Sequence, residues 1–351
     1  MKKQYRFILL VMLLTAQACV CQPKSSHNFL ASLEGQLVFT DSRLNDAWGV
    51  LDFSGDNATI KHTDESVLGV FSPDREWELL LIGEEDTNND GVIDQSDRSS
   101  LYLSRVGSSE KERVDLPYPV GTCTWGVEYM VAACSFAASD VSTDENAGTG
   151  DNRVLYMVDL KSGELLRRLS DPSKSSWAPS WSPDGSMVAF EIGTINEDRL
   201  EDRLEEKGIQ VVDVQTGDLI YEIAEPFADE PVWSPDGTRL AFVASLGSGE
   251  YSGATIEHMY RDVFYVDLCD ESPAVINVTR TSRFSKIPAP LTHLGGIWVH
   301  QPNWSPDGSA IASVWSQDDS EQIWVTSVDG DEWAQLTKGK GHQYFIVEWH
   351  P

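Results

Sequence analysis

A short turn sequence recurs along this chain, and its recurrence constrains the fold more than any other feature. Three copies read Trp-Ser-Pro-Asp-Gly and one partial copy reads Phe-Ser-Pro-Asp; they lie at 71–74, 181–185, 233–237 and 304–308. This is turn chemistry, because Pro restricts φ, Asp can bond its own backbone and Gly tolerates a positive φ. Copies spaced by roughly 50 to 70 residues, once a degenerate copy near residue 124 is included, indicate a repeat protein.

Each repeat is expected to be a four-stranded antiparallel sheet. A short apolar run follows each of the last three turns, as in 187–190, so the turn joins two strands of a hairpin whose first strand ends on a bulky anchor residue. A second hairpin accompanies it: residues 154–160 and 164–169 flank a Lys-Ser-Gly turn, and 209–223 repeat that pattern. Two hairpins per repeat give four strands.

Six inner strands are predicted, and they end at Phe71, Thr124, Trp181, Trp233, Trp304 and Trp349. The last of these strands ends on its anchor residue with no partner strand after it. Residues 35–41 resemble the missing partner, so the first and last strands are expected to pair in one sheet. Such pairing closes a ring and protects the sheet edges. The predicted fold class is all-β, a six-bladed β-propeller over residues 34–351.

The Trp-Ser-Pro-Asp-Gly turns resemble the WD40-like (PD40) repeats of TolB-type β-propellers, which also occur in the propeller domains of prolyl oligopeptidase-like enzymes. The resemblance covers about residues 34–351 and implies a six-bladed propeller. It implies no activity, because propellers are scaffolds for many unrelated functions. TolB proteins carry an additional N-terminal α/β domain, for which the residues before 34 leave no room, so their partners are not transferred.

Residues 1–18 are expected to be a secretory signal peptide. A basic start is followed by an apolar run at 7–14 and by Ala16-Gln17-Ala18 before Cys19. Simple cleavage and lipidation of Cys19 are both open; the small residue before Cys19 favours a lipoprotein, with 19–33 as a tether. The mature chain is then expected in the periplasm or at the cell surface, in contact with the membrane only through its lipid anchor.

The chain is strongly acidic. Its formal net charge of −30 becomes −33 when residues 1–18 are removed, because they contain three basic and no acidic residues. An acidic surface repels nucleic acid and anionic lipid head groups, which excludes those partners, and it attracts cations. For most of the acidic residues, solubility is a sufficient reason.

Cys123 and Cys134 lie on the two arms of one predicted hairpin. The register inferred from the intact repeats offsets them by about three residues, which favours free buried thiols over a bridge. Together with Cys269 they are too few to form a disulfide framework in an exported domain of this size.

Residues 86–97 match a twelve-residue calcium loop. Oxygen ligands are expected from the side chains of Asp86, Asn88, Asp90, Asp94 and Asp97 and from the carbonyl of Val92. Such a loop curls round the ion and presents every second residue to it, and Gly91 permits the bend. The flanks read as strands and position 12 is Asp rather than Glu, so the loop resembles dockerin repeats more than a sensor EF-hand. We expect Ca²⁺ as a structural clamp; a polar turn with coincidental spacing is the alternative.

Long connections are expected on one face of the ring, at 135–152, 193–207, 246–261 and 270–297, while the recurrent turns lie on the other. Variation concentrated on one face marks a recognition surface. The residues that enter the inner strands should surround the mouth of the central channel on that face, and they include Trp177, Asp229, His300 and Phe345. They could contact a ligand; a hydrated channel without function is the other interpretation.

The sequence contains no Gly-x-Ser-x-Gly elbow, no His-Glu-x-x-His, no Cys-x-x-Cys and no phosphate-binding Gly-Lys-Ser/Thr loop. The leading hypothesis is an exported, lipid-anchored, calcium-stabilised propeller that binds protein or glycan in the bacterial cell envelope, as a monomer and without catalysis. The alternative is a metal-dependent propeller hydrolase or lyase with its site in the central channel.

Overall fold

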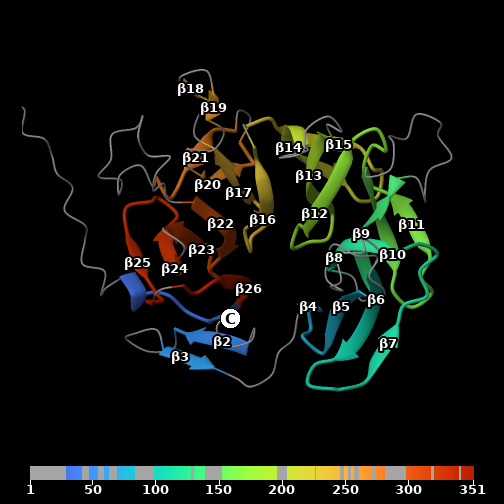
Figure 1. Cartoon of the computed structure of the whole chain (residues 1–351), viewed down its shortest axis with the longest axis horizontal. Helices are drawn as coiled ribbons and strands as arrows, with labels where there is room; N and C mark the ends of the chain where they lie inside the picture. Colours follow the sequence, from blue (N-terminus) through green and yellow to red (C-terminus); the bar gives the residue numbers. More distant parts are fainter. Residues whose placement is uncertain are drawn as a thin grey trace, which may run out of the picture.

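Antiparallel sheets arranged around a common centre make up the fold (Figure 1). This computed structural model describes residues 29–41, 47–53, 59–62, 69–83, 99–127, 130–138, 152–195, 204–225, 227–245, 249–251, 254–256, 261–270, 273–280, 298–317, 320–339 and 341–351. Within these residues no helix has the length and apolar character needed to cross a membrane. The all-β class predicted from the sequence is confirmed.

The described strands form two four-stranded sheets, two eight-stranded sheets and a separate two-stranded one. Each eight-stranded sheet consists of two four-stranded units joined by a single residue pair, Ser99↔Val120 in one and Arg261↔Trp298 in the other. We call the four-stranded units blades 1 to 6. Blade 1 contains β26 (Tyr344–His350), β1 (Gln36–Asp41), β2 (Ala47–Asp52) and β3 (Thr59–His62). Blade 2 contains β4 (Gly69–Phe71), β5 (Trp77–Gly83), β6 (Ser99–Arg105) and β7 (Lys111–Arg113). Blade 3 contains β8 (Val120–Trp125), β9 (Val131–Ala137), β10 (Arg153–Asp159) and β11 (Leu165–Arg168).

Blades 4 to 6 follow the same order. Blade 4 contains β12 (Ser175–Trp181), β13 (Met187–Ile195), β14 (Leu204–Asp213) and β15 (Leu219–Ile223). Blade 5 contains β16 (Asp229–Trp233), β17 (Arg239–Ser245), β20 (Arg261–Asp267) and β21 (Val275–Asn277). Blade 6 contains β22 (Trp298–Trp304), β23 (Ala310–Gln317), β24 (Ser320–Ser327) and β25 (Trp333–Gln335). The first strand of each blade lies nearest the centre (Figure 1).

Blade 1 joins the two ends of the described chain. β26 pairs with β1 from Gln36↔His350 to Asp41↔Tyr344, with an irregularity between Val38 and Phe39. Apolar residues from both ends are buried together in one hydrophobic cluster, to which Phe29 and Leu33 also belong. The packed region therefore includes Phe29 and Leu33, which lie inside the segment 19–33 that was expected to be a tether.

Three of the expected long connections contain more regular structure than the sequence suggested. β13 continues to Ile195 and β14 begins at Leu204, so the hairpin of blade 4 extends further than predicted. The segment 246–261 contains a small separate hairpin of β18 (Gly249–Tyr251) and β19 (Ala254–Ile256). The segment 270–297 supplies β21, the outer strand of blade 5.

Each inner strand ends at or next to an anchor residue, and in three blades this residue bonds to the preceding blade. Trp125, not Thr124, occupies this position in blade 3, because it pairs with Ala132 as Trp181 pairs with Val188. The prediction of Thr124 as anchor was therefore wrong by one residue. The anchor indoles of blades 3, 5 and 6 donate their N–H to a backbone carbonyl one residue before the preceding anchor: Trp125 to Val70 (2.7 Å), Trp233 to Ser180 (3.1 Å) and Trp304 to Val232 (3.1 Å).

The recurrent turn is a closed hydrogen-bond network. In the 181–187 turn the buried Ser182 hydroxyl donates to Asp184 Oδ1 (2.7 Å) and accepts the Met187 amide (2.9 Å), while Asp184 Oδ1 accepts the Ser186 amide (3.0 Å). The same bonds recur in the turns that begin at Ser72, Ser234 and Ser305. The Ser327 turn between β24 and β25 also has them, although Val replaces Pro. Ser and Asp therefore define this turn more strictly than Pro does.

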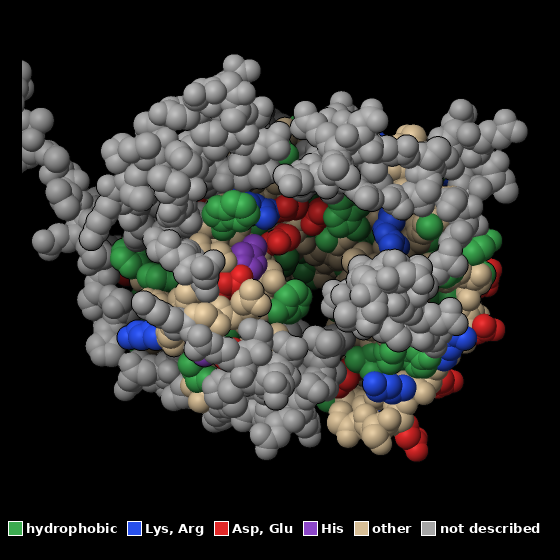
Figure 2. Space-filling view, in the orientation of Figure 1, with side chains coloured by type: hydrophobic (Ala, Val, Ile, Leu, Met, Phe, Trp, Pro, Cys, Tyr) green, Lys and Arg blue, Asp and Glu red, His purple; other side chains and the backbone are tan. Residues whose placement is uncertain are grey.

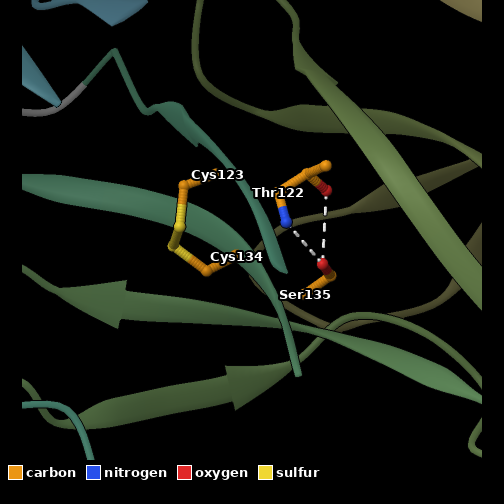
Figure 3. The surroundings of a disulfide bond; sticks show 4 residues. All are labelled: Thr122, Cys123, Cys134 and Ser135. Atoms are coloured by element: carbon orange, nitrogen blue, oxygen red, sulfur yellow. Dashed lines mark hydrogen bonds between the residues drawn. A yellow bond between two sulfur atoms is a disulfide. The ribbon is translucent and has the colours of Figure 1, made fainter. Parts of the chain in front are cut away.

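Cys123 and Cys134 form a disulfide between β8 and β9 (Figure 3). The expectation of free thiols is overturned, and the reason is the register. A shift between Val120 and Cys123 places Cys123 directly opposite Cys134, with a Cα–Cα distance of 4.2 Å. Beside the bridge, the Ser135 hydroxyl accepts the Thr122 amide at 2.8 Å, which satisfies a backbone donor at the irregularity. The bridge lies in the blade whose turn has lost the Ser-Pro-Asp-Gly network.

We expect the Cys123→Ala/Cys134→Ala double variant to lower the free energy of unfolding by about 2–3 kcal/mol, because the bridge closes a short loop in the unfolded chain. Urea unfolding measures this difference. The control is Cys269→Ser, since Cys269 is a free and exposed thiol whose replacement should leave stability unchanged. Equal stability of the double variant and the control would show that the bridge does not hold the hairpin together.

The hydrogen-bond network of the recurrent turn predicts part of the loss of folding stability at acidic pH. The Ser234 hydroxyl is the main group that lowers the pKa of Asp236, to about 2. A carboxyl pKa that is lower in the folded than in the unfolded state stabilises the fold at pH values above the ordinary pKa of Asp. This stabilisation is lost as the pH falls from about 4 towards about 2. Asp236→Asn should therefore flatten the decline in thermal stability over that range. Asp218→Asn removes the same charge outside the network and serves as the control; equal slopes for the two variants would contradict the prediction.

Candidate functional site

The entry to three successive inner strands bends at the same place. Ala178, Glu230 and Gln301 each lie three residues before an anchor Trp and have positive φ values of 47°, 53° and 54°. The pairing registers of β12, β16 and β22 shift around these residues. Trp177, Asp229 and His300 immediately precede the bends, and Phe345 holds the corresponding position in β26, four residues before Trp349. The four residues predicted for the channel mouth are therefore equivalent positions of four blades.

Side-chain oxygens connect the bent strands around the centre. Glu191 Oε1 accepts the amide of Glu230 at 2.8 Å, the Glu230 carboxylate accepts the amide of Gln301, and Gln301 Oε1 accepts the amide of Ile346 at 2.8 Å. These bonds run from blade 4 through blades 5 and 6 to blade 1. A left-handed conformation costs a non-glycine residue about 1–2 kcal/mol, and the bonds offset that cost at Glu230 and Gln301.

Asp229 is paired with an arginine from the third strand of its blade. Its carboxylate forms an ion pair with Arg261, the first residue of β20, and the two side chains are only 14% and 18% exposed. The backbone of Arg261 also pairs with Trp298 at the start of β22, across the junction of blades 5 and 6. The pair therefore lies where two blades meet. Removing one partner of a pair this buried would leave an uncompensated charge.

His300 faces a carboxylate at the equivalent place in blade 6. Its Nε2 lies 3.5 Å from Oε1 of Glu321, which also accepts the Ser316 hydroxyl, while Oε2 accepts the Tyr344 amide at 2.8 Å. Burial opposes ionisation of Glu321, but the bonds from His300 and Tyr344 outweigh it and hold the pKa of this carboxyl below its ordinary value. Glu321 is therefore an anion that links β22, β24 and β26.

Blade 3 has a third version of this arrangement. Gly121 lies four residues before Trp125, and a Cβ atom there would come within 2.5 Å of Nη1 of Arg153, the first residue of β10. In three blades, the residue four before the anchor thus faces a charged residue at the start of the third strand. The charges differ from blade to blade, so the centre is not a symmetric ring.

Two large aromatic side chains are exposed at the entries of neighbouring inner strands. Trp298 in β22 is 47% exposed and Phe345 in β26 is 54% exposed. Figure 2 shows hydrophobic, acidic, basic and histidine side chains around a central hollow of the molecule. Aromatic rings beside fixed polar groups can bind a ligand by stacking and hydrogen bonding.

Several residues of this site are not among those predicted from the sequence. Glu230 and Gln301 could have been found, since each lies three residues before an anchor Trp. Arg261 and Glu321 come from third strands, and the connections between second and third strands vary in length. Glu191 comes from a second strand that follows a recurrent turn, but the amide that it accepts belongs to the next blade. No spacing in the sequence points to them.

The expected metal ligands fall outside the part of the chain that the structure describes. This applies to Asp86, Asn88, Asp90, Val92, Asp94 and Asp97, and also to Cys19, the expected lipidation site. Their flanking strands are described and confirm the sequence prediction, because β5 and β6 pair up to Gly83↔Ser99. Among the described residues, no group of three or more His, Cys, Asp or Glu is arranged to hold a metal ion.

Solved structures share the fold. TolB from Acinetobacter baumannii matches over 91% of this chain and 67% of its own, with 14% identity and a TM-score of 0.53. Putative TolB from Agrobacterium tumefaciens matches over 91% of this chain and 99% of its own, with 17% identity and a TM-score of 0.51. No family model matches the chain, and no curated protein matches its sequence. The chain has a TolB-like β-propeller fold.

The bonds between inner strands predict a stability effect. We expect Glu230→Ala to lower the free energy of unfolding by about 1–3 kcal/mol, because it leaves the Gln301 amide without its acceptor. The control is Glu222→Ala, which removes an exposed carboxylate that accepts only a side-chain bond from Gln210. Chemical unfolding compares the two variants, and a loss no larger than that of the control would contradict a structural role for Glu230.

Proposed function

We propose that this protein is a binding module of the bacterial cell envelope, which takes a protein or glycan partner at the face that carries the channel mouth. The observation that supports this most is the pair of exposed aromatic side chains, Trp298 and Phe345, beside Asp229, His300 and their charged partners. Aromatic residues are enriched where proteins bind partners and contribute much of the binding energy.

The backbone beneath this surface is already ordered. The bends at Glu230 and Gln301 are held by bonds from neighbouring blades, so a ligand would not need to order these strands. A preorganised site loses less entropy when it binds. Trp177 in blade 4 holds the position equivalent to Asp229, His300 and Phe345. Like Phe345, it brings a large aromatic side chain to that position.

Export and anchoring form the second part of the proposal. Residues 1–18 have the pattern of a signal peptide, and lipidation of Cys19 would attach the mature chain to the membrane. Because Phe29 is already packed in the core, the tether would be the segment 20–28. The propeller would then be held close to the membrane surface.

Calcium is the proposed cofactor. The calcium motif at 86–97 lies between β5 and β6 in the sequence, and the pairing of Gly83 with Ser99 fixes the two ends of that connection. An ion bound by the motif would clamp the connection rather than move two helices apart. Extracellular loops of this kind bind calcium weakly, with Kd on the order of 10⁻⁴ to 10⁻³ M.

Capture of a partner from envelope extracts tests the proposal. We expect Trp298→Ala and Phe345→Ala each to reduce capture by about tenfold or more, as for central aromatic residues of interfaces. Ile220→Ala is the matched control, since Ile220 is 56% exposed on β15, the outer strand of blade 4. Equal capture by all three variants would rule out this face as the binding surface.

A chelator arm of the same experiment tests the role of calcium. Asp86→Ala/Asp90→Ala should abolish calcium binding in a titration at millimolar concentrations and should reproduce the effect of chelator on capture. Calcium binding that survives this double substitution would rule out the loop as the site.

A further inference from the structure

The contact between blades 1 and 2 differs in chemistry from the contacts of blades 3, 5 and 6 with their preceding blades. In those three contacts, the N–H of the anchor indole donates to a backbone carbonyl of the preceding blade. The carbonyl belongs to the residue just before that blade's own anchor. Among the described residues the indole N–H of Trp181 in blade 4 has no partner, and that of Trp349 in blade 1 donates to Glu34. Blade 2 has Phe71 as its anchor, and a phenyl ring has no N–H to donate.

Between blades 1 and 2, an ion pair of side chains takes the place of the indole–carbonyl bond. Glu348 lies one residue before the anchor Trp349, the place that supplies the acceptor carbonyl in the other blades. Arg75, from the turn that follows Phe71, forms an ion pair with the Glu348 carboxylate. The Arg75 guanidinium also lies 5.1 Å from the centre of the Phe71 ring, where a cation–π contact is favourable.

The backbone of Arg75 is unusual for its residue type. Arg75 has φ 58°, while the same turn position is occupied by Gly185, Gly237 and Gly308 with φ values of 73°, 71° and 70°. A left-handed conformation is unfavourable for arginine and costs glycine little. A glycine here would therefore be easier to accommodate, but only a long cationic side chain reaches Glu348.

A histidine lies next to this pair without taking part in it. Nδ1 of His350 is 3.6 Å from the Glu348 carboxylate. Burial, together with the charge of Arg75, lowers the pKa of His350 to about 4, so it is neutral near pH 7. Burial raises the pKa of Glu348, and the charge of Arg75 opposes that shift.

We propose that Arg75 and Glu348 form a charged clasp that holds blade 2 against blade 1. This junction then loosens when salt screens its charges, whereas the three junctions linked by an indole N–H do not. An ion pair whose side chains are about one-third exposed is weakened by salt, whereas a neutral indole–carbonyl bond is not. The clasp is thus a conformational device that allows the propeller to open next to the blade that carries the calcium motif.

Hydrogen exchange measured by mass spectrometry at low and at molar salt tests the clasp in the full mature chain. At molar salt, the amides of β4 and β26 should exchange on the order of tenfold faster than at low salt. This factor lies between the effects typical of exposed and of buried ion pairs. Glu348→Gln should show fast exchange at both salt concentrations. The matched control is Glu76→Gln, which removes an exposed ion pair with Arg105 near the same turn and should behave like the natural protein. Equal salt responses of β4, β16 and β22 would overturn the proposal.

A double-mutant cycle keeps the test independent of any single variant. Arg75→Gly restores the residue that the other turns use and should fold. Urea unfolding of Arg75→Gly, Glu348→Gln and the double variant should give non-additive losses, and the non-additivity should shrink at molar salt. Fully additive losses would show that the two side chains do not act together and would overturn the clasp.

Discussion

The anchor indole is the interaction on which the rest of this propeller depends. In blades 3, 5 and 6 its ring is buried at the end of an inner strand, and its N–H bonds to a carbonyl of the preceding blade. One side chain thus ends a strand, fills the core between two sheets and sets their separation. Because the bond is made to a backbone atom, it constrains the position of the preceding strand whatever side chains that strand carries.

The opposite ends of the inner strands are held differently. There Glu191, Glu230 and Gln301 accept backbone amides of the next blade, and the bonds from Glu191 and Glu230 help to stabilise the left-handed conformations of Glu230 and Gln301. Indoles hold one end of these strands and side-chain oxygens hold the other. Asp229 and His300 lie immediately before the bends, on strands that are held at both places, which suits them to contact a ligand.

The acidic composition gains a more specific meaning from these contacts. Glu191, Glu230 and Glu321 lie around the centre, where a group of carboxylates suggests a cation site. Each of them accepts a backbone amide instead, and Glu321 also faces His300. Their charge is used to join blades, so net charge alone says little about what the channel mouth binds.

The sequence alone determined the all-β propeller class, the recurrent turns and most anchor positions, because these depend on a few neighbouring residues with distinctive chemistry. It also indicated that Trp177, Asp229, His300 and Phe345 belong together, since each lies four residues before an anchor. Only the tertiary structure decided the anchor of blade 3, the Cys123–Cys134 bridge and the partners Arg261 and Glu321. These depend on strand register, which is fixed by packing between strands far apart in the chain and changes with a single irregular residue.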